Sequence, residues 1–149
     1  MSIPAVARST HYLSIPSSTR YLEDVRRFVA HHAQQASFPD AAVEQFKIAV
    51  DEACTNVIKH AYKGESAHQI DISVVVEPDR FTIRIQDEGV SFVPSEYREP
   101  DLMAIAKQRR KGGFGVHIMR RLMDQVEYLK HGPINEVRLT KYRPLNGKA

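Results

Sequence analysis

A long amphipathic segment, residues 40–62, is the feature that most restricts how this chain can fold. Its apolar residues recur every three or four positions, which is the spacing of one face of an α-helix. We therefore expect a long helix that packs one face against a core, with its end marked by Gly64. The apolar stripe consists of Val43, Phe46, Val50, Ala53, Val57 and Ala61.

Two polar residues, Glu52 and Asn56, are expected to project from the other side of this helix. They lie one turn apart in the sequence, so their side chains should point in the same direction. A carboxylate can accept a proton and a carboxamide can bind a metal ion, which makes the pair a candidate chemical centre. A polar helix face is more often simply solvated, so the pair alone does not decide between the two interpretations.

Alternating segments elsewhere in the chain predict a sheet. Residues 70–76 and 81–86 alternate apolar and polar positions around a short turn, which predicts an antiparallel hairpin. Residues 8–15 predict a first strand at the edge of the sheet, and residues 125–130 and 135–142 predict two final strands. Helical spacing predicts another helix over residues 19–37.

Asp87 follows the second strand of the hairpin and has the same parity as the apolar residues Phe81, Ile83 and Ile85. It is therefore expected to point toward the covered face of the sheet. A carboxylate there needs a partner, because burying it unpaired costs several kcal/mol or forces protonation. Three explanations remain open: a bond from a backbone amide, fraying of the strand at Asp87, or a bond from the amino group of a ligand.

A basic, glycine-rich turn over residues 107–115 precedes a further segment with helical spacing. Backbone N–H groups at the start of a helix favour an anion, so this turn is a candidate phosphate-binding site. Glycine-rich turns also occur for purely steric reasons, and the Walker and dinucleotide-binding patterns are absent from the sequence. The connection before the turn is longer than about 15 residues, which is typical of a functional lid or a mobile loop.

Composition limits the class of protein. A chain of 149 residues, 42% of them hydrophobic, is long enough for one core, and we expect a single domain. The net charge of +3 comes from mixed charges without a basic stripe interleaved with aromatic residues, which argues against direct nucleic-acid binding. Cys54, the single cysteine, is expected in the core. Neither a membrane span nor a secretory signal is visible, so we expect a cytoplasmic protein.

Three short segments occur in a fixed order along the chain: Glu52-Ala53-Cys54-Thr55-Asn56 on a helix, Asp87-Glu88-Gly89-Val90-Ser91-Phe92 after a strand, and Gly112-Gly113-Phe114-Gly115 at the start of a helix. This order and spacing resembles the N box and the two glycine boxes of the gyrase, heat-shock chaperone, histidine kinase and MutL ATPase superfamily. The resemblance covers about residues 8–143. Within that superfamily, the small size resembles the anti-sigma-factor serine/threonine kinases of the RsbW and SpoIIAB type.

The resemblance implies the Bergerat-type ATP-binding fold, an α/β (α+β) two-layer sandwich with a mixed, mostly antiparallel sheet covered on one face by helices. It also implies ATP and Mg²⁺ as cofactors. The residues it assigns to them are Asn56 for Mg²⁺, Asp87 for the adenine amino group, Gly89 for space beside the base, Gly112, Gly113 and Gly115 for the phosphates, and Lys111, or failing that Arg110, near the γ-phosphate.

Two positions depart from the superfamily pattern. Ser91 stands in place of the usual last glycine of the first glycine box, which affects the expected hinge of the lid. Asn135 stands near the position where the superfamily commonly has Thr. It shares parity with Val137 and Leu139, so it is a candidate to point inward as a substitute in the adenine region.

Glu52 separates the kinase subclasses. A serine or threonine hydroxyl must lose a proton as it attacks, so a carboxylate at this position can act as general base, whereas histidine kinases typically have Asn there. The resemblance therefore implies a serine/threonine kinase that phosphorylates a STAS-type anti-anti-sigma protein, alternately binds a sigma factor and forms a homodimer. Two alternatives stay open: a nucleotide-binding partner-switch module with little or no turnover, and nucleic-acid binding by residues 107–111.

Overall fold

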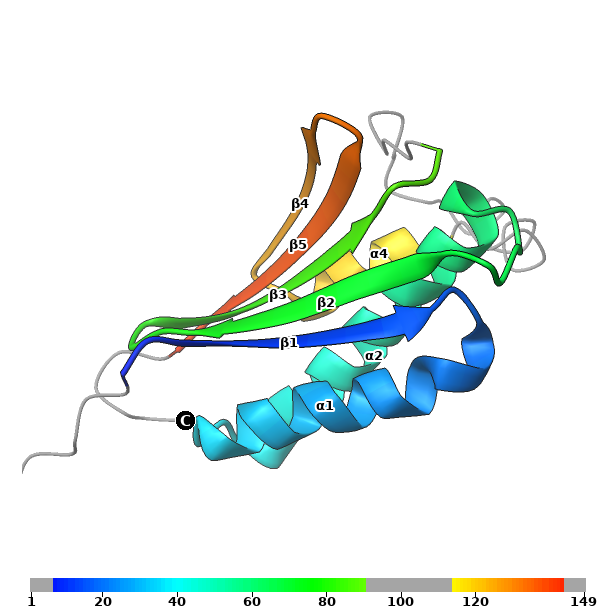
Figure 1. Ribbon diagram of the computed structural model, residues 1–149. Coiled ribbons are helices and arrows are strands. Elements are labelled where there is room, and N and C mark those ends of the chain that lie inside the picture. Colours follow the sequence, from blue (N-terminus) through cyan, green and yellow to red (C-terminus); the bar gives the residue numbers. More distant parts are fainter. Residues whose placement is uncertain (1–6, 91–113, 144–149) are drawn as a thin grey trace, which may run out of the picture.

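The computed structural model describes residues 7–90 and 114–143 of the chain (Figure 1), without the side chains of residues 114 and 115. The predicted lid and Lys111, Gly112 and Gly113 therefore lie outside the described residues. The elements are β1 (Ser9–Pro16), η1 (Thr19–Tyr21), α1 (Leu22–Gln35), α2 (Asp40–Asn56), η2 (Val57–Ala61), β2 (Gln69–Val76), β3 (Arg80–Asp87), α4 (Phe114–Leu122), β4 (Gln125–His131) and β5 (Ile134–Tyr142).

The five strands form one sheet in the order β1-β2-β3-β5-β4, with β1 at an edge as predicted. All four strand pairs are antiparallel, so the sheet of the described residues is not mixed. The reason lies in the short turns, because a strand that is followed by a tight turn must run back along its neighbour. This applies to the hairpin of β2 and β3 and to the hairpin of β4 and β5.

Helices α1, α2 and α4 lie on the same side of the sheet (Figure 1), which gives the predicted two-layer α+β sandwich. All six residues of the apolar stripe of α2 are buried, with at most 6% of their surface exposed. Phe46 of the stripe packs on Phe81 of β3 with ring centroids 4.6 Å apart, and Phe38 meets both rings edge to face. The core therefore lies between α2 and the centre of the sheet. None of the described helices is long and apolar enough to cross a membrane.

The segment predicted as one helix over residues 40–62 changes its winding at Asn56. The α-helix α2 ends there, and Val57–Ala61 form one wider π-helical turn, closed by a bond from Tyr62 N to Val57 O of 3.0 Å. The prediction of a continuous α-helix was wrong for these residues. A contact with the segment after β3 accompanies the wide turn, since Val90 N donates to Ala61 O at 2.8 Å. Gly64, with φ of +82°, ends the helical segment as predicted.

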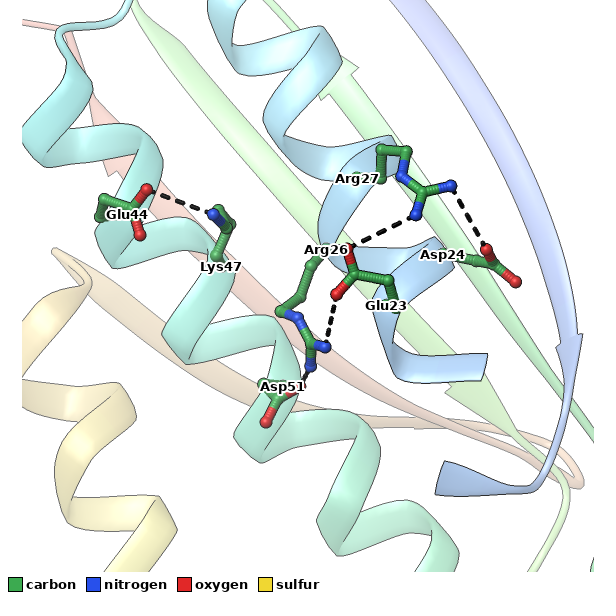
Figure 2. A network of polar contacts seen from close by, with 7 residues as sticks. All are labelled: Glu23, Asp24, Arg26, Arg27, Glu44, Lys47 and Asp51. Atoms are coloured by element: carbon green, nitrogen blue, oxygen red, sulfur yellow. Dashed lines mark hydrogen bonds and ion pairs between the residues drawn. The ribbon is translucent and has the colours of Figure 1, made fainter. Parts of the chain in front are cut away.

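Helix α1 is joined to α2 by charged side chains on the side away from the sheet (Figure 2). Arg26 of α1 pairs with Asp51 of α2, and it also bonds Glu23 at 2.7 Å within its own helix. Glu23 lies in the first turn of α1, where an acidic residue also interacts favourably with the helix dipole. The network holds the side chain of Asp51 in place. Asp51 directly precedes Glu52 in the sequence, so its charge affects the electrostatics around Glu52.

Candidate functional site

A cavity opens between helices α2 and α4 and strands β3, β5 and β4, with a volume of about 610 Å³ that includes a part open to solvent. Small-molecule sites are mostly apolar with a few converging polar groups, and the lining of this cavity has that character. Its polar lining includes Asn56 from α2, Asp87 from β3, and Tyr128, Lys130 and Asn135 from β4 and β5. Three residues predicted from the sequence, Asn56, Asp87 and Asn135, are thus brought together in one cavity.

Asn56 lies at the last position of α2 and keeps 9% of its surface exposed. Its Nδ2 atom is buried without a hydrogen-bond partner among the described residues. A buried amide donor of this kind is costly unless a ligand satisfies it. The carboxamide therefore suits a ligand that brings oxygen atoms to this end of the cavity.

Asp87 is the last residue of β3 and is 6% exposed, so its predicted inward orientation is confirmed. The strand does not fray there, since Asp87 pairs in register with Asn135 of β5. Its Oδ1 atom accepts hydrogen bonds from Gly89 N and from Asn135 Nδ2, each at 2.9 Å. The predicted bond from a backbone amide is therefore present, and the side chain of Asn135 adds a second donor. The second oxygen, Oδ2, receives no hydrogen bond from the described residues and remains an acceptor for a donor within the cavity.

Gly89 is required by close packing against the helical segment. A Cβ atom at this position would lie 2.4 Å from Ala61 O and 2.6 Å from Ala61 C, distances that backbone atoms do not tolerate. The neighbouring Glu88 N donates to Tyr62 Oη at 2.8 Å, which fixes the same segment from its other side. The absence of a side chain at Gly89 thus serves the contact between the end of β3 and the π-helical turn.

Glu52 lies one turn before Asn56 on α2 and is half-buried, but it does not line the cavity. Partial burial raises the pKa of its carboxyl group, and the negative charge of Asp51 raises it further, while Lys59 opposes both effects. The structure therefore separates the predicted pair: Asn56 lines the cavity, and Glu52, one turn earlier on the same helix, does not.

The second glycine box is described in part. Gly115 is the second residue of α4, in agreement with the prediction that these glycines precede or begin a helix. Met119 of the same helix lines the cavity and is fully buried, so α4 forms one wall of the site. Cys54 is also fully buried, and burial raises the pKa of its thiol to about 12, as befits the predicted core residue.

Tyr128 and Lys130 of β4 are among the lining residues that the sequence analysis missed. Burial raises the pKa of Tyr128 to about 12. Both residues have the parity of the covered face, because Tyr128 pairs with Val137 and Lys130 pairs with Asn135. The alternation that placed Asn135 would have placed them too, had the register of the last hairpin been worked out.

The comparison with protein families now defines the class. The family model described as the histidine kinase-like ATPase domain matches residues 15–141, so the fold is that of an ATPase domain of this class. A crystal structure of the RsbU and RsbW domains of a Mycobacterium tuberculosis protein has the same fold, with a TM-score of 0.64 at 12% identity. That match covers 91% of this chain and 33% of the other, so the present chain spans about a third of it.

Curated relatives narrow the class further. The serine-protein kinase RsbW of Bacillus subtilis is 33% identical over 91% of this chain and 86% of its own length. The serine-protein kinase RsbW of Listeria monocytogenes is 33% identical over 87% of this chain and 85% of its own length. The chain belongs to the RsbW family of serine-protein kinases.

Proposed function

We propose that this protein is a single-domain, ATP- and Mg²⁺-dependent serine/threonine kinase that acts as an anti-sigma factor. Its substrate would be a STAS-type anti-anti-sigma protein, and in the alternative state it would bind a sigma factor, as a homodimer. Such a cycle takes place where transcription does, in the cytoplasm. The observation that carries the proposal is the cavity itself, which has the acceptor Asp87 on one side and the buried amide of Asn56 on another.

The residues of the cavity suit a purine nucleotide. Asp87 Oδ2 offers a hydrogen-bond acceptor for the amino group of adenine, and apolar side chains such as Met119 and Val57 offer surfaces for the base. Asn56 offers its partnerless Nδ2 to phosphate oxygens. Gly115, at the start of α4, belongs to the turn that we assign to the phosphates together with Gly112, Gly113 and Lys111.

Asn56 is also the residue that we assign to Mg²⁺. The described residues contain no group of three or more His, Cys, Asp or Glu side chains that could hold a metal ion by themselves. Mg²⁺ commonly retains water and binds through one or two protein groups together with substrate phosphates, so the carboxamide oxygen of Asn56 fits this ion. The chemistry that Mg²⁺ supplies when bound is the neutralisation of charge on the phosphates.

Glu52 is the residue that we assign as general base. Its carboxylate would accept the proton of the serine or threonine hydroxyl as that oxygen attacks the γ-phosphoryl group. Partial burial and the adjacent Asp51 raise the pKa of Glu52, which makes it a stronger base than an exposed glutamate. Glu52 is only half-buried, which leaves its carboxylate accessible to a side chain presented by a partner protein.

The test is phosphotransfer to a STAS protein encoded in the same genome, followed by intact-mass measurement after incubation with Mg·ATP. We expect the substrate to gain the mass of one phosphoryl group. Glu52→Gln should keep nucleotide binding, measured by calorimetry, and lower the transfer rate by about 10²- to 10⁴-fold. Glu44→Gln is the matched control, because Glu44 is an exposed glutamate of the same helix that pairs with Lys47 (Figure 2). Undiminished transfer by Glu52→Gln would remove the assignment of the base.

A second candidate is a nucleotide-binding module that switches partners with little or no turnover. It is favoured by the position of Glu52, which does not line the cavity. Under this alternative, the wild-type protein would bind nucleotide and sigma factor, but the STAS protein would gain no mass in the same experiment. Size-exclusion chromatography with light scattering tests the proposed homodimer in both cases.

A further inference from the structure

Lys130 and Asn135 are opposite each other in the hairpin of β4 and β5, and both line the cavity. The ammonium group of Lys130 donates a hydrogen bond to Asn135 Oδ1 at 3.1 Å. At the other end of the same carboxamide, Asn135 Nδ2 donates to Asp87 Oδ1 and to Gly89 O, each at 2.9 Å. Three side chains from three strands thus form one chain of hydrogen bonds.

The chemistry of the three groups gives this chain a direction. An ammonium group can only donate hydrogen bonds, and an ionised carboxylate can only accept them. The carboxamide between them satisfies both neighbours in one orientation, with its oxygen toward Lys130 and its nitrogen toward Asp87. The reversed orientation would turn the amide nitrogen toward the ammonium group and the amide oxygen toward the carboxylate. Lys130 therefore favours, together with the acceptor Gly89 O, the orientation of Asn135 that donates to Asp87.

The consequence falls on the carboxylate of Asp87. With Asn135 Nδ2 and Gly89 N both on Oδ1, the rotation of the carboxylate is fixed and Oδ2 is left as the acceptor for a donor in the cavity. We infer that Lys130 is a positioning residue for nucleotide selection: through Asn135 it aims Asp87 at the exocyclic amino group of the base. This inference rests on the proposed nucleotide-binding function and adds a residue of β4 to it.

A positioning role of Lys130 and a merely structural role predict different effects on nucleotide affinity. If Lys130 only tied β4 to β5, its removal would loosen the cavity and lower the affinity for all nucleotides alike. If it acts through Asp87, its removal should matter only for a base that carries the amino group. Adenosine diphosphate and purine riboside diphosphate make this comparison, because the second has hydrogen in place of the 6-amino group.

The experiment measures the affinity of the full-length protein for both nucleotides by calorimetry. Lys130→Met keeps much of the side-chain length but removes the hydrogen-bond donor. It should lower the affinity for adenosine diphosphate about fivefold, as expected for the loss of one hydrogen bond. The affinity for purine riboside diphosphate should change by less than about twofold, because this nucleotide has no 6-amino group to donate to Asp87. Lys130→Arg retains a charged donor, so it should keep the preference for adenosine diphosphate over purine riboside diphosphate that Lys130→Met loses. Lys47→Met is the matched control, since Lys47 lies on the outer side of α2 (Figure 2).

A second comparison tests the route through Asn135. In an Asn135→Ala background, Lys130→Met should have no further effect on the affinity for adenosine diphosphate, because the intermediate link is already lost. Thermal unfolding of each variant without nucleotide establishes that it is folded. An equal loss for both nucleotides, or no loss for either, would overturn the inference while leaving nucleotide binding intact. Failure of the wild-type protein to bind adenosine diphosphate would instead overturn the proposed function.

Discussion

Asn135 Nδ2 donates a hydrogen bond to Asp87 Oδ1 at 2.9 Å, between the second residue of β5 and the last residue of β3. The same nitrogen also donates to Gly89 O, so one side chain holds both the buried carboxylate and the backbone two residues later. On its other side, Gly89 is pressed against Ala61. The end of β3 is therefore fixed between the last strand and the π-helical turn, and this arrangement gives the candidate site its shape.

Gly89→Ala is expected to destabilise the protein strongly. The added Cβ would lie 2.4 Å from Ala61 O, and the obstacle is backbone, which cannot swing aside as a side chain does. We expect a loss of about 3 kcal/mol, the upper part of the range for overpacking, and a fall in Tm of roughly 6 to 12 °C. Thermal unfolding by circular dichroism measures it.

Gly64→Ala is the control for this substitution. Gly64 has φ of +82° but nothing within 4 Å of the added atom, so its cost comes from backbone conformation alone. That cost should be about 1 kcal/mol. If Gly89→Ala proved no more harmful than Gly64→Ala, the close contact with Ala61 would not be what requires glycine.

Much of this site followed from the alternation of the strands. Parity placed Asp87 on the covered face, and it gave Asn135 the same direction. All six residues that the helical periodicity of the central segment assigned to the apolar stripe are likewise buried. These predictions succeeded because burial on one face of a strand or helix is a local, periodic constraint.

Features that depend on contacts between distant segments were not predictable in the same way. The π-helical turn after Asn56 contacts Gly89 and Val90, which are remote in the sequence, so residue spacing alone does not reveal it. The side chain of Glu136 lies on the face without helices, where alternation predicts exposure, yet it is fully buried under arginine side chains. Helical spacing also could not show that Asn56 lines the cavity while Glu52 does not.

Glu136 is expected to contribute strongly to stability from the outer face of the sheet. Its carboxylate accepts hydrogen bonds from Arg84, Gln86 and Arg138 at 2.8 to 3.2 Å. Glu136→Ala would leave two arginines facing each other without their shared partner. We expect a loss of about 3 kcal/mol, the lower end of the range for breaking a buried pair, because both arginines remain about one-third exposed.

The pH dependence of this contribution follows from the pKa of Glu136. Burial alone would raise that pKa, but the hydrogen bonds from Arg84, Gln86 and Arg138 outweigh burial and lower it below 4.5. The stabilisation should therefore be complete above pH 4.5 and should disappear as the pH falls through the lowered pKa. Denaturant titrations across this range measure it. Asp79→Asn is the control, because it breaks an exposed pair with Arg80 and should cost less than about 1 kcal/mol.

Glu52→Gln is expected to stabilise the protein at neutral pH, even though it should slow phosphotransfer strongly. Burial and Asp51 raise the pKa of Glu52 above 4.5, so the folded protein holds this proton more tightly than the unfolded chain. Ionisation of Glu52 therefore opposes folding as the pH rises through that window. The variant should unfold at a higher temperature than wild type at pH 7, and the difference should vanish below pH 4.5. A lower Tm for the variant at pH 7 would contradict this account.

Arg26 is expected to set the pH at which Glu52 becomes an active base, although it lies on another helix. Arg26 pairs with Asp51, the residue whose negative charge helps to raise the pKa of Glu52 (Figure 2). In Arg26→Met, Asp51 keeps its charge but loses its partner, so the pKa of Glu52 should rise further. A base must be ionised to accept a proton, and the acid limb of the phosphotransfer profile should therefore move to higher pH.

The measurement is the rate of phosphotransfer against pH for Arg26→Met, wild type and Arg27→Met. Arg27 contacts Glu23 and Asp24 on the outer side of α1 and is 71% exposed, so it provides the same chemical change away from Asp51. At a pH well above the raised pKa, all three proteins should transfer phosphate at similar rates, because Glu52 is then ionised in each. An acid limb that stays in place, or that moves to lower pH, would mean that the charge of Asp51 does not act on the group that accepts the proton. That result would count against Glu52 as the base, since the two carboxylates are neighbours on the same helix.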